Sequence, residues 1–249
     1  MTRVVEPRLR SRCYDAAMCG RYALYGPISR HRPMPDDAPL PAWWPALADT
    51  INAGPMRFNV APTDSMPVVG TSREGAIKIR EVRWGLVPYW AKDAKIGARA
   101  INARVETIAE KPMFREAFKR RRCLVPASGY FEWKVEGAAK QPYFIHDADG
   151  ALLMFAGLWE SWRESTESEP LQTYTIVVGP PGVVSGDIHD RAPVILPESA
   201  WHTWLTGDVA AAASLLEHAR EPALKYHPVS KAVGSPKNDA PVLVEPLAT

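Results

Sequence analysis

Residues 77–88, IKIREVRWGLVP, alternate apolar and polar side chains at a period of two. This period is typical of a β-strand with one buried face, because successive side chains of a strand point to opposite sides. Pro88 and the aromatic pair that follows it end the pattern. Similar short apolar segments predict further strands at 66–69, 123–126, 128–133, 141–145, 152–159 and 174–178.

Helices are expected to be few and short. The chain contains 24 prolines, which remove backbone N–H donors and interrupt helices. Helical spacing of apolar residues occurs at 108–118 and again within 198–220, whereas 28–55 is expected to be a solvated loop with one amphipathic turn that buries Trp43 or Trp44. The turn at 147–150 between two predicted strands indicates a hairpin. We therefore expect a single α+β domain with a mostly antiparallel sheet or open β-barrel core and flanking short helices.

Composition excludes some classes of protein. The 249 residues are 46% hydrophobic, which suffices for a core. The formal net charge is +2, so any nucleic-acid site must be a local basic patch. Three cysteines do not make a disulfide framework and fit a reducing compartment. No apolar run approaches the ~18–20 residues that span a membrane, and the N-terminus lacks a secretory signal, so a cytoplasmic protein without a membrane partner is expected.

Residues 1–17, MTRVVEPRLRSRCYDAA, show no clear period. We expect a disordered leader or a start codon placed too far upstream, absent from the mature protein. Met18 would then be the initiator, and methionine is generally removed before a residue as small as cysteine. The domain is therefore expected over 18–249, with Cys19 as the first residue after processing.

An N-terminal Cys19 would carry a thiol and a free α-amine on neighbouring carbons. Such a 1,2-aminothiol forms a Schiff base with an aldehyde and then closes through sulfur to a thiazolidine. The ordinary pKa of the α-amine is about 7.7–8.0 and that of the thiol about 8.5, so both have a reactive fraction near neutral pH. The alternative is that Cys19 is a small buried hydrophobe, as free cysteines commonly are.

A glutamate lies between large aromatic residues in the predicted strand at 128–133, SGYFEW. The period of two places Phe131 and Trp133 on one face, and Tyr130 and Glu132 on the other. A carboxylate held against apolar surface has a raised pKa and exchanges protons near neutrality. An exposed glutamate on a strand would be equally ordinary, and the residues alone leave both interpretations open.

His189 is followed directly by an aspartate and an arginine, in a loop before a predicted strand. It serves either a structural hydrogen bond or a catalytic proton shuttle. The basic run Lys119–Arg122 usually indicates a solvated face, with a phosphate contact as the alternative. The sequence contains no P-loop, Rossmann fingerprint, or CxxC or HExxH metal signature.

Motifs occur in a fixed order along most of the chain: MCGRY (18–22), FNVAPT (58–63), WGLVPYWAKD (84–93), NARVET (102–107), RCLVPASGYFEW (122–133), FAGLWE (155–160) and IHDRAPV (188–194). Together they resemble the SRAP family, the SOS response-associated peptidases. The resemblance extends from Cys19 to about residue 230. Any one motif would be weak evidence, but their common order is specific.

The resemblance implies a DNA–protein crosslinking enzyme that acts at abasic sites in single-stranded DNA during the DNA damage response. Cys19 would condense with the ring-opened sugar aldehyde to a stable thiazolidine that shields the lesion. The active site would consist of Cys19, Asn102, Glu132 and His189. His189 or Glu132 would shuttle the proton in ring opening, and Glu132 would take a proton from the α-ammonium. Asn102 would hold the sugar oxygens.

The resemblance also implies a DNA-binding surface, association with the nucleoid, no metal or organic cofactor, and a monomer. Arg21 and Arg104 match phosphate-binding arginines, which position DNA without reading its sequence. Pro62 and Trp84 match an apolar wedge that unstacks the bases beside the lesion. We expect a local groove lined by Arg21, Arg83, Arg104 and Arg120–Arg122.

The sequence departs from the family pattern at a few positions. Asp64, Val178 and Ala192 stand where a glutamine, a frequent threonine and a methionine are expected, and the leader blocks the α-amine unless it is removed. Two other functions stay open. One is an N-terminal-cysteine autopeptidase or amidohydrolase that cleaves after Met18. The other is a non-covalent binder of modified single-stranded DNA.

Overall fold

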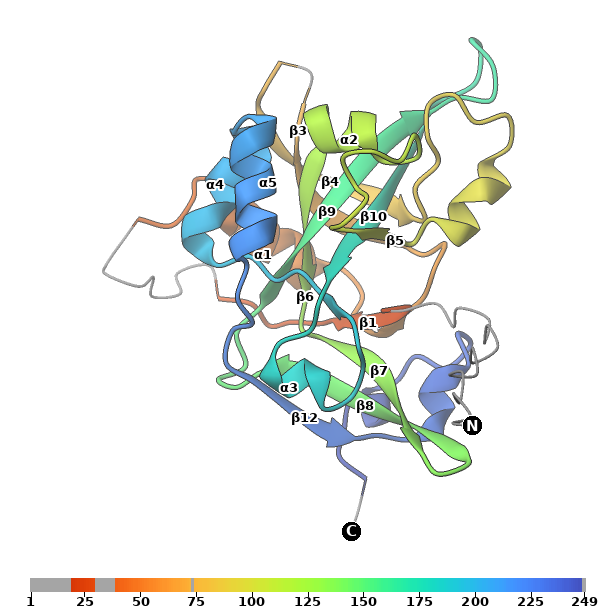
Figure 1. Ribbon diagram of the computed structural model, residues 1–249, viewed down its shortest axis with the longest axis vertical. Coiled ribbons are helices and arrows are strands. Elements are labelled where there is room, and N and C mark those ends of the chain that lie inside the picture. The colour runs from red at the N-terminus through yellow and green to blue at the C-terminus, as the bar shows by residue number, and fades with distance from the viewer. Residues whose placement is uncertain (1–18, 30–38, 73, 248–249) are drawn as a thin grey trace, which may run out of the picture.

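A closed five-stranded barrel forms the centre of the computed structural model, which describes residues 19–29, 39–72 and 74–247 (Figure 1). Around the barrel lie β10 (Leu171–Gly179), β4 (Ile77–Trp84), β3 (Ser65–Thr71), β6 (Arg122–Ala127) and β9 (Leu153–Trp162). β9 pairs with β10 and so closes the ring. β10 and β4 are parallel, and the other neighbours are antiparallel. The predicted α+β class is confirmed, with a closed barrel as its core.

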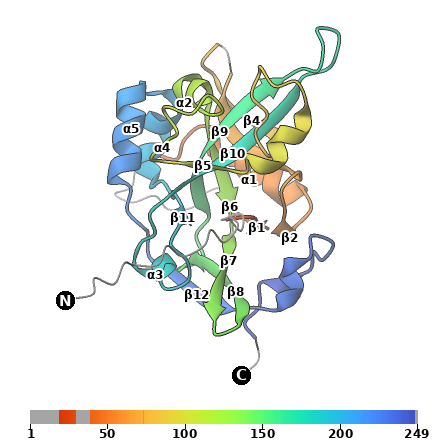
Figure 2. The ribbon, with the colours of Figure 1, turned by 45° about the vertical axis from the view of Figure 1, so that its right-hand side comes forward.

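A second sheet of five strands lies at one end of the barrel, and Figure 2 shows it below the barrel. Its strands, in order, are β12 (Leu224–Pro228), β8 (Ala139–Asp147), β7 (Gly129–Glu136), β1 (Arg21–Leu24) and β2 (Arg57–Val60). β6 continues into β7 with one residue between them, so a nearly continuous chain connects the barrel to this sheet. Two short strands extend the pairing of β10. They are β5 (Asn102–Arg104) and β11 (Ala192–Pro193).

Short helices surround the barrel. α4 and α5 cover one side of it, and α2 lies at the end away from the second sheet (Figure 1). The helices are α1 (Trp44–Ala53), α2 (Arg115–Arg120), α3 (Val183–Gly186), α4 (Glu198–Thr206) and α5 (Val209–His218), with 3₁₀ turns η2 (Ala94–Arg99), η3 (Lys231–Gly234) and η4 (Pro241–Leu243). In the described part of the chain, none of them is long and apolar enough to cross a membrane.

The alternation of β7 divides its side chains between two cores. Tyr130 belongs to the main core of the barrel, whereas Phe131 belongs to a smaller core under the second sheet, with Trp133 packed against it. The face assignment predicted for this strand is confirmed. Glu132 therefore points to the barrel side, into the interior of the protein, where it is 3% exposed.

The predicted hairpin around residues 147–150 is wrong. β8 and β9 flank this turn, but β8 pairs with β7 and β12 while β9 pairs with β6 and β10. A period of two identifies the buried face of a strand but not its neighbour. The predicted helix at 108–118 is also wrong in extent. α2 begins only at Arg115, because Pro112 lacks a backbone N–H and disfavours helical backbone at the residue before it.

Residues 28–55 also differ from the expected loop. Their described part contains α1, a helix of ten residues whose first residue, Trp44, is fully buried. The Trp44 ring stacks on Trp201 of α4, with ring centroids 5.8 Å apart. Burial of one tryptophan, as predicted, is therefore confirmed, but a helix carries it.

The basic run at the end of α2 is mostly structural. Arg122 is 4% exposed and donates to main-chain oxygens of Phe118 (2.8 Å), Trp204 and Gly207. Arg121 forms an ion pair with Glu160 at 2.7 Å. These two arginines therefore attach α2 and α4 to the barrel. Arg122 is enclosed by these contacts and Arg121 is partly exposed, and their place in a DNA groove stays a prediction.

Candidate active site

Cys19 lies two residues before the start of β1, and its main-chain nitrogen contacts Glu132 of β7. The nitrogen donates a hydrogen bond to Glu132 Oε1 over 2.7 Å. The antiparallel pairing of Arg21 with Phe131 produces this contact between residues far apart in the sequence. Cys19 is 2% exposed and Glu132 3%. A buried carboxylate is thus in hydrogen-bond reach of the nitrogen from which it would have to take a proton.

Burial changes the acidity of both groups. Burial raises the pKa of Glu132, while Cys19 and His189 act in the opposite direction. The pKa of the Cys19 thiol is raised well above its ordinary value, first by burial and then by the charge of Glu132 and a hydrogen bond with it. The thiol is therefore protonated near neutral pH, and burial makes the Glu132 carboxylate a stronger base than an exposed one.

His189 lies in the loop between α3 and β11, with its side chain 25% exposed. Its Nδ1 is 3.2 Å from the main-chain nitrogen of Arg191 and 3.0 Å from Asp190 Oδ1. The backbone N–H needs a lone pair on Nδ1, which places the proton of the neutral ring on Nε2. Asp190 favours a proton on Nδ1 instead, but its side chain is 87% exposed and is a weak partner in water.

Asn102 begins β5 and pairs with Ile176 of β10. Its Nδ2 is buried and has no hydrogen-bond partner in the described structure. A buried donor without a partner costs about 1–3 kcal/mol, so it is a group that a bound oxygen would satisfy. Arg104 lies two residues further on the same strand. The period of a strand therefore places Asn102 and Arg104 on one face, with the buried Ala103 on the other.

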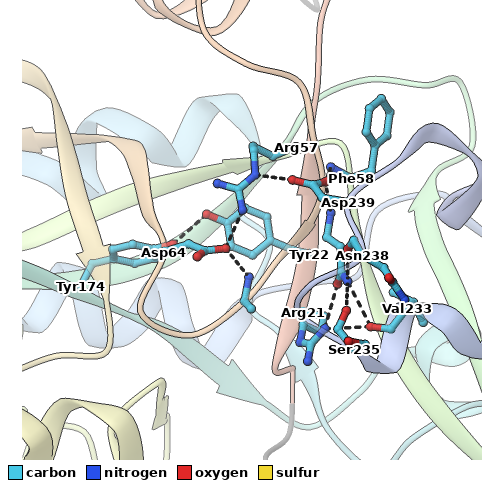
Figure 3. Close-up of polar contacts among 12 residues, drawn as sticks. Arg21, Tyr22, Arg57, Phe58, Asp64, Tyr174, Val233, Ser235, Asn238 and Asp239 are labelled. Carbon is cyan, nitrogen blue, oxygen red and sulfur yellow. Dashed lines mark hydrogen bonds and ion pairs between the residues drawn. The ribbon is translucent and has the colours of Figure 1, made fainter.

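Arg21 attaches the C-terminal segment to the second sheet (Figure 3). Its Nη1 donates to Asn59 Oδ1 (3.0 Å) and to the carbonyl oxygen of Val233 (2.7 Å), and its Nη2 donates to the carbonyl oxygen of Gly234 (3.0 Å). Asn59 Nδ2 holds the same segment through three main-chain oxygens. The guanidinium therefore already has a structural role, whatever it contributes to a phosphate contact.

The two residues predicted as an apolar wedge are placed very differently. Trp84 is fully buried, and its Nε1 donates to the carbonyl oxygen of Ile101 over 2.9 Å. Its ring is enclosed in this structure, and its contact with a base stays a prediction. Pro62 is partly exposed, in a turn where Asp64 Oδ2 accepts the N–H of Ala61 over 3.0 Å. Pro62 remains a candidate for a DNA contact.

Sequence reasoning assigned no role to some residues around the site. Tyr130 shares the face of Glu132, is 1% exposed, and has its pKa raised by burial first and then by Cys19 and Glu132. The period of two signalled its position but not its role. An ion pair between Glu106 and Arg191 connects the end of β5 to the His189 loop. No sequence pattern signals a pair so far apart in the chain. Within the described residues, no three His, Cys, Asp or Glu side chains gather as metal ligands.

The fold and this site define a known class, and the chain belongs to the SOS response associated peptidase (SRAP) family, whose sequence model matches residues 18–236. Among its relatives are proteins named abasic site processing protein. YoqW of Bacillus subtilis is 40% identical over 192 residues, which cover 76% of this chain and 85% of the relative. YedK of Escherichia coli is 34% identical over 196 residues, covering 77% and 85%.

Solved structures agree in fold. A crystal structure of a protein from Bacteroides thetaiotaomicron superposes with a TM-score of 0.67 at 29% identity, covering 77% of this chain and 86% of that one. A phage-related protein from Bordetella bronchiseptica gives a TM-score of 0.62 at 30% identity, covering 86% and 95%. The expected family and fold are confirmed. The roles of Cys19, Asn102, Glu132 and His189 stay predictions, and the expected leader lies outside the described residues.

Proposed function

We propose that this protein processes abasic sites in single-stranded DNA by a covalent crosslink through Cys19. Membership of the family, and relatives named for abasic site processing, support the substrate. The observation that carries the chemistry is the 2.7 Å contact between the Cys19 nitrogen and the buried Glu132 carboxylate. That nitrogen is a peptide N–H in the full chain and becomes an α-amine when residues 1–18 are removed.

Schiff-base formation is the first step at this nitrogen. Glu132 takes a proton from the α-ammonium, and the free amine attacks the aldehyde carbon of the ring-opened sugar. The carbinolamine then loses its hydroxyl as water, with the proton supplied by Glu132 or His189. Ring closure follows when the Cys19 sulfur adds to the imine carbon and the thiol proton passes to the imine nitrogen. The product is a thiazolidine, one water is released, and no oxidant or reductant is needed.

Ring opening and DNA positioning are assigned to the neighbouring groups. In ring opening the anomeric hydroxyl loses a proton and the ring oxygen gains one, so His189 Nε2 or Glu132 only has to carry this proton from one oxygen to the other. Asn102 Nδ2 is available to a sugar hydroxyl. Arg104 shares a face with Asn102 and suits the adjoining phosphate, while Pro62 suits the flanking base. A flexible single strand brings its sugar to a recessed cysteine more readily than a duplex does, and one copy of the chain holds all these groups.

A denaturing gel tests this proposal with an abasic single-stranded oligonucleotide. We expect the leader-free protein to form an adduct that survives heating in detergent, and Cys19→Ala to form none. Cys123→Ala is the matched control, because Cys123 is also buried but lies in β6, within the barrel. An adduct with Cys19→Ala would contradict the proposal. A band shift that disappears on heating would instead indicate non-covalent binding.

A second candidate function is self-cleavage after Met18, and the backbone of Cys19 favours it. Cys19 has a φ of 44°, a strained conformation for a residue other than glycine. Its sulfur would attack the Met18 carbonyl carbon, the C–N bond would break to leave a thioester, and Glu132 would protonate the departing nitrogen. Water would then hydrolyse the thioester.

Intact mass of the full chain without DNA tests this self-cleavage: we expect loss of residues 1–18, which Glu132→Gln prevents. Loss at an equal rate in that variant would contradict it.

A further inference from the structure

Glu221, in the connection between α5 and β12, reaches the loop that carries His189. Its two carboxylate oxygens accept the backbone N–H groups of Val184 (2.8 Å) and Ser185 (2.9 Å) at the start of α3. This approach depends on a missing side chain, because a Cβ atom at Gly182 would lie 2.4 Å from Glu221 Cβ. Only a glycine at position 182 therefore leaves room for the Glu221 side chain.

Ser185 connects Glu221 to His189 through backbone hydrogen bonds. The Ser185 carbonyl oxygen accepts the N–H groups of Ile188 and His189, each over 3.0 Å. Its hydroxyl accepts the N–H of Gly182 over 3.0 Å, and the residue is 1% exposed. Hydrogen bonds that a carboxylate accepts are roughly twice as strong as those between neutral groups. The carboxylate of Glu221 thus fixes the buried turn to which the His189 backbone is hydrogen-bonded.

The position of Glu221 relates His189 to Glu132. β12, which begins three residues after Glu221, belongs to the same sheet as β7, which carries Glu132. Figures 1 and 2 both show α3 beside this part of the sheet, and Tyr226 of β12 donates to Asp187 over 3.3 Å. The other end of the loop is tied to β5 through the Arg191–Glu106 ion pair. Glu221 therefore sets the His189 loop against the sheet that holds its proposed catalytic partner.

We propose that Glu221 is a positioning residue for His189, an inference that rests on the proposed crosslinking function. Glu221 does not touch the reacting atoms. Through the α3 turn it holds the imidazole where it exchanges protons with the sugar. Loss of its carboxylate is expected to leave Cys19 and Glu132 in place and to weaken only the steps that depend on His189.

Single-turnover crosslinking rates test this inference, with Glu217→Ala as the matched control, because Glu217 is an exposed glutamate one helical turn earlier. We expect Glu221→Ala to slow crosslinking about tenfold, a part of the ~10²–10⁴ that a positioned acid–base group contributes, and Glu217→Ala to leave the rate unchanged. Glu221→Gln keeps one acceptor oxygen and should lose less. In a His189→Ala background, Glu221→Ala should cause no further loss, because coupled residues are not additive.

The outcomes separate this inference from the function on which it rests. An unchanged rate in Glu221→Ala, or a full further loss in the His189→Ala background, would overturn the positioning role alone. Absence of any Cys19-dependent adduct in the wild-type protein would overturn the proposed function and this inference together. If Glu221→Ala fails to fold, Glu221→Gln is combined with His189→Ala in its place. If the losses of crosslinking rate in these two variants then add, the inference is contradicted.

Discussion

Two glutamates are buried to almost the same degree in different regions of this protein. Glu132 of β7 is 3% exposed, and Glu160 of β9 is 4% exposed. Burial raises the pKa of both. Glu160 faces a guanidinium, with Arg121 Nη2 at 2.7 Å, and accepts the N–H of Ser161. Glu132 faces the main-chain nitrogen of Cys19.

The difference shows that burial alone does not define a catalytic carboxylate. The fixed charge of Arg121 favours the ionised form of Glu160, and this pair ties α2 to the barrel wall. The Cys19 nitrogen, by contrast, would become a titratable amine if residues 1–18 were removed, as we propose. The partner of each buried carboxylate therefore distinguishes the structural ion pair of Glu160 from the proposed proton acceptor, Glu132.

The largest expected effect separates the two glutamates by activity. Glu132→Gln should slow crosslinking of abasic single-stranded DNA by about 10²-fold or more, because the amide accepts no proton from the amine. Glu160→Gln should leave the rate of the folded protein unchanged. Single-turnover rates on denaturing gels measure both. Equal losses in the two variants would mean that Glu132 is only a structural group.

Stability should show the reverse order. Glu160→Ala leaves Arg121 without its partner, and because that side chain is 23% exposed we expect a loss of about 2 kcal/mol in the free energy of unfolding, below the range for a fully buried pair. Glu132→Gln strands no cation and should cost less. Urea denaturation of both variants checks this. A greater loss in the free energy of unfolding for Glu132→Gln than for Glu160→Ala would contradict this expectation.

The pH dependence of stability should report Glu132 in the full chain, in which the Cys19 nitrogen is an amide. The pKa of Glu132 is raised on folding, first by burial. Its contribution is thus fully present below the ordinary carboxyl pKa of about 4.3 and is lost as pH rises through the higher folded pKa. Relative to Glu132→Gln, the wild-type protein should lose free energy of unfolding over this window. If the wild-type protein instead gained free energy of unfolding relative to Glu132→Gln as the pH rises, the raised pKa of Glu132 would be contradicted.

The smallest effect concerns the thiol. Glu132 contributes to the raised pKa of Cys19, after burial. Glu132→Gln should therefore increase the rate of Cys19 alkylation by iodoacetamide modestly, and Glu160→Gln should not. Peptide mass spectrometry of the folded full chain measures the rate at Cys19. A slower reaction in Glu132→Gln would show that the carboxylate activates the thiol instead.

Local patterns in the sequence predicted what depends on near neighbours. The period of two placed Tyr130 and Glu132 on one face, and ordered motifs identified the family. Local patterns failed where contacts with distant parts of the chain determine the surroundings of a residue. Arg122 looks solvated in sequence, yet carbonyl oxygens of α4 and its end surround it. The enclosure of the Trp84 ring by the barrel core likewise depends on parts of the chain far from it in the sequence.

Contacts across long stretches of chain left no signal in the local sequence pattern. Glu221 and Ser185 are 36 residues apart, and nothing in their neighbourhoods links them before the chain is folded. The same holds for the contact between Cys19 and Glu132, which are 113 residues apart. The family resemblance placed both residues in one site, but their hydrogen bond depends on the register of β1 with β7.

The most direct test compares two forms of the same protein, one that begins at Cys19 and one that keeps residues 1–18, each verified by intact mass. Both are incubated with abasic single-stranded DNA and heated in detergent. The leader-free form should carry a covalent adduct, and the longer form should carry none for as long as its mass stays unchanged. A heat-stable adduct on chains whose Cys19 nitrogen is still acylated would contradict the central claim.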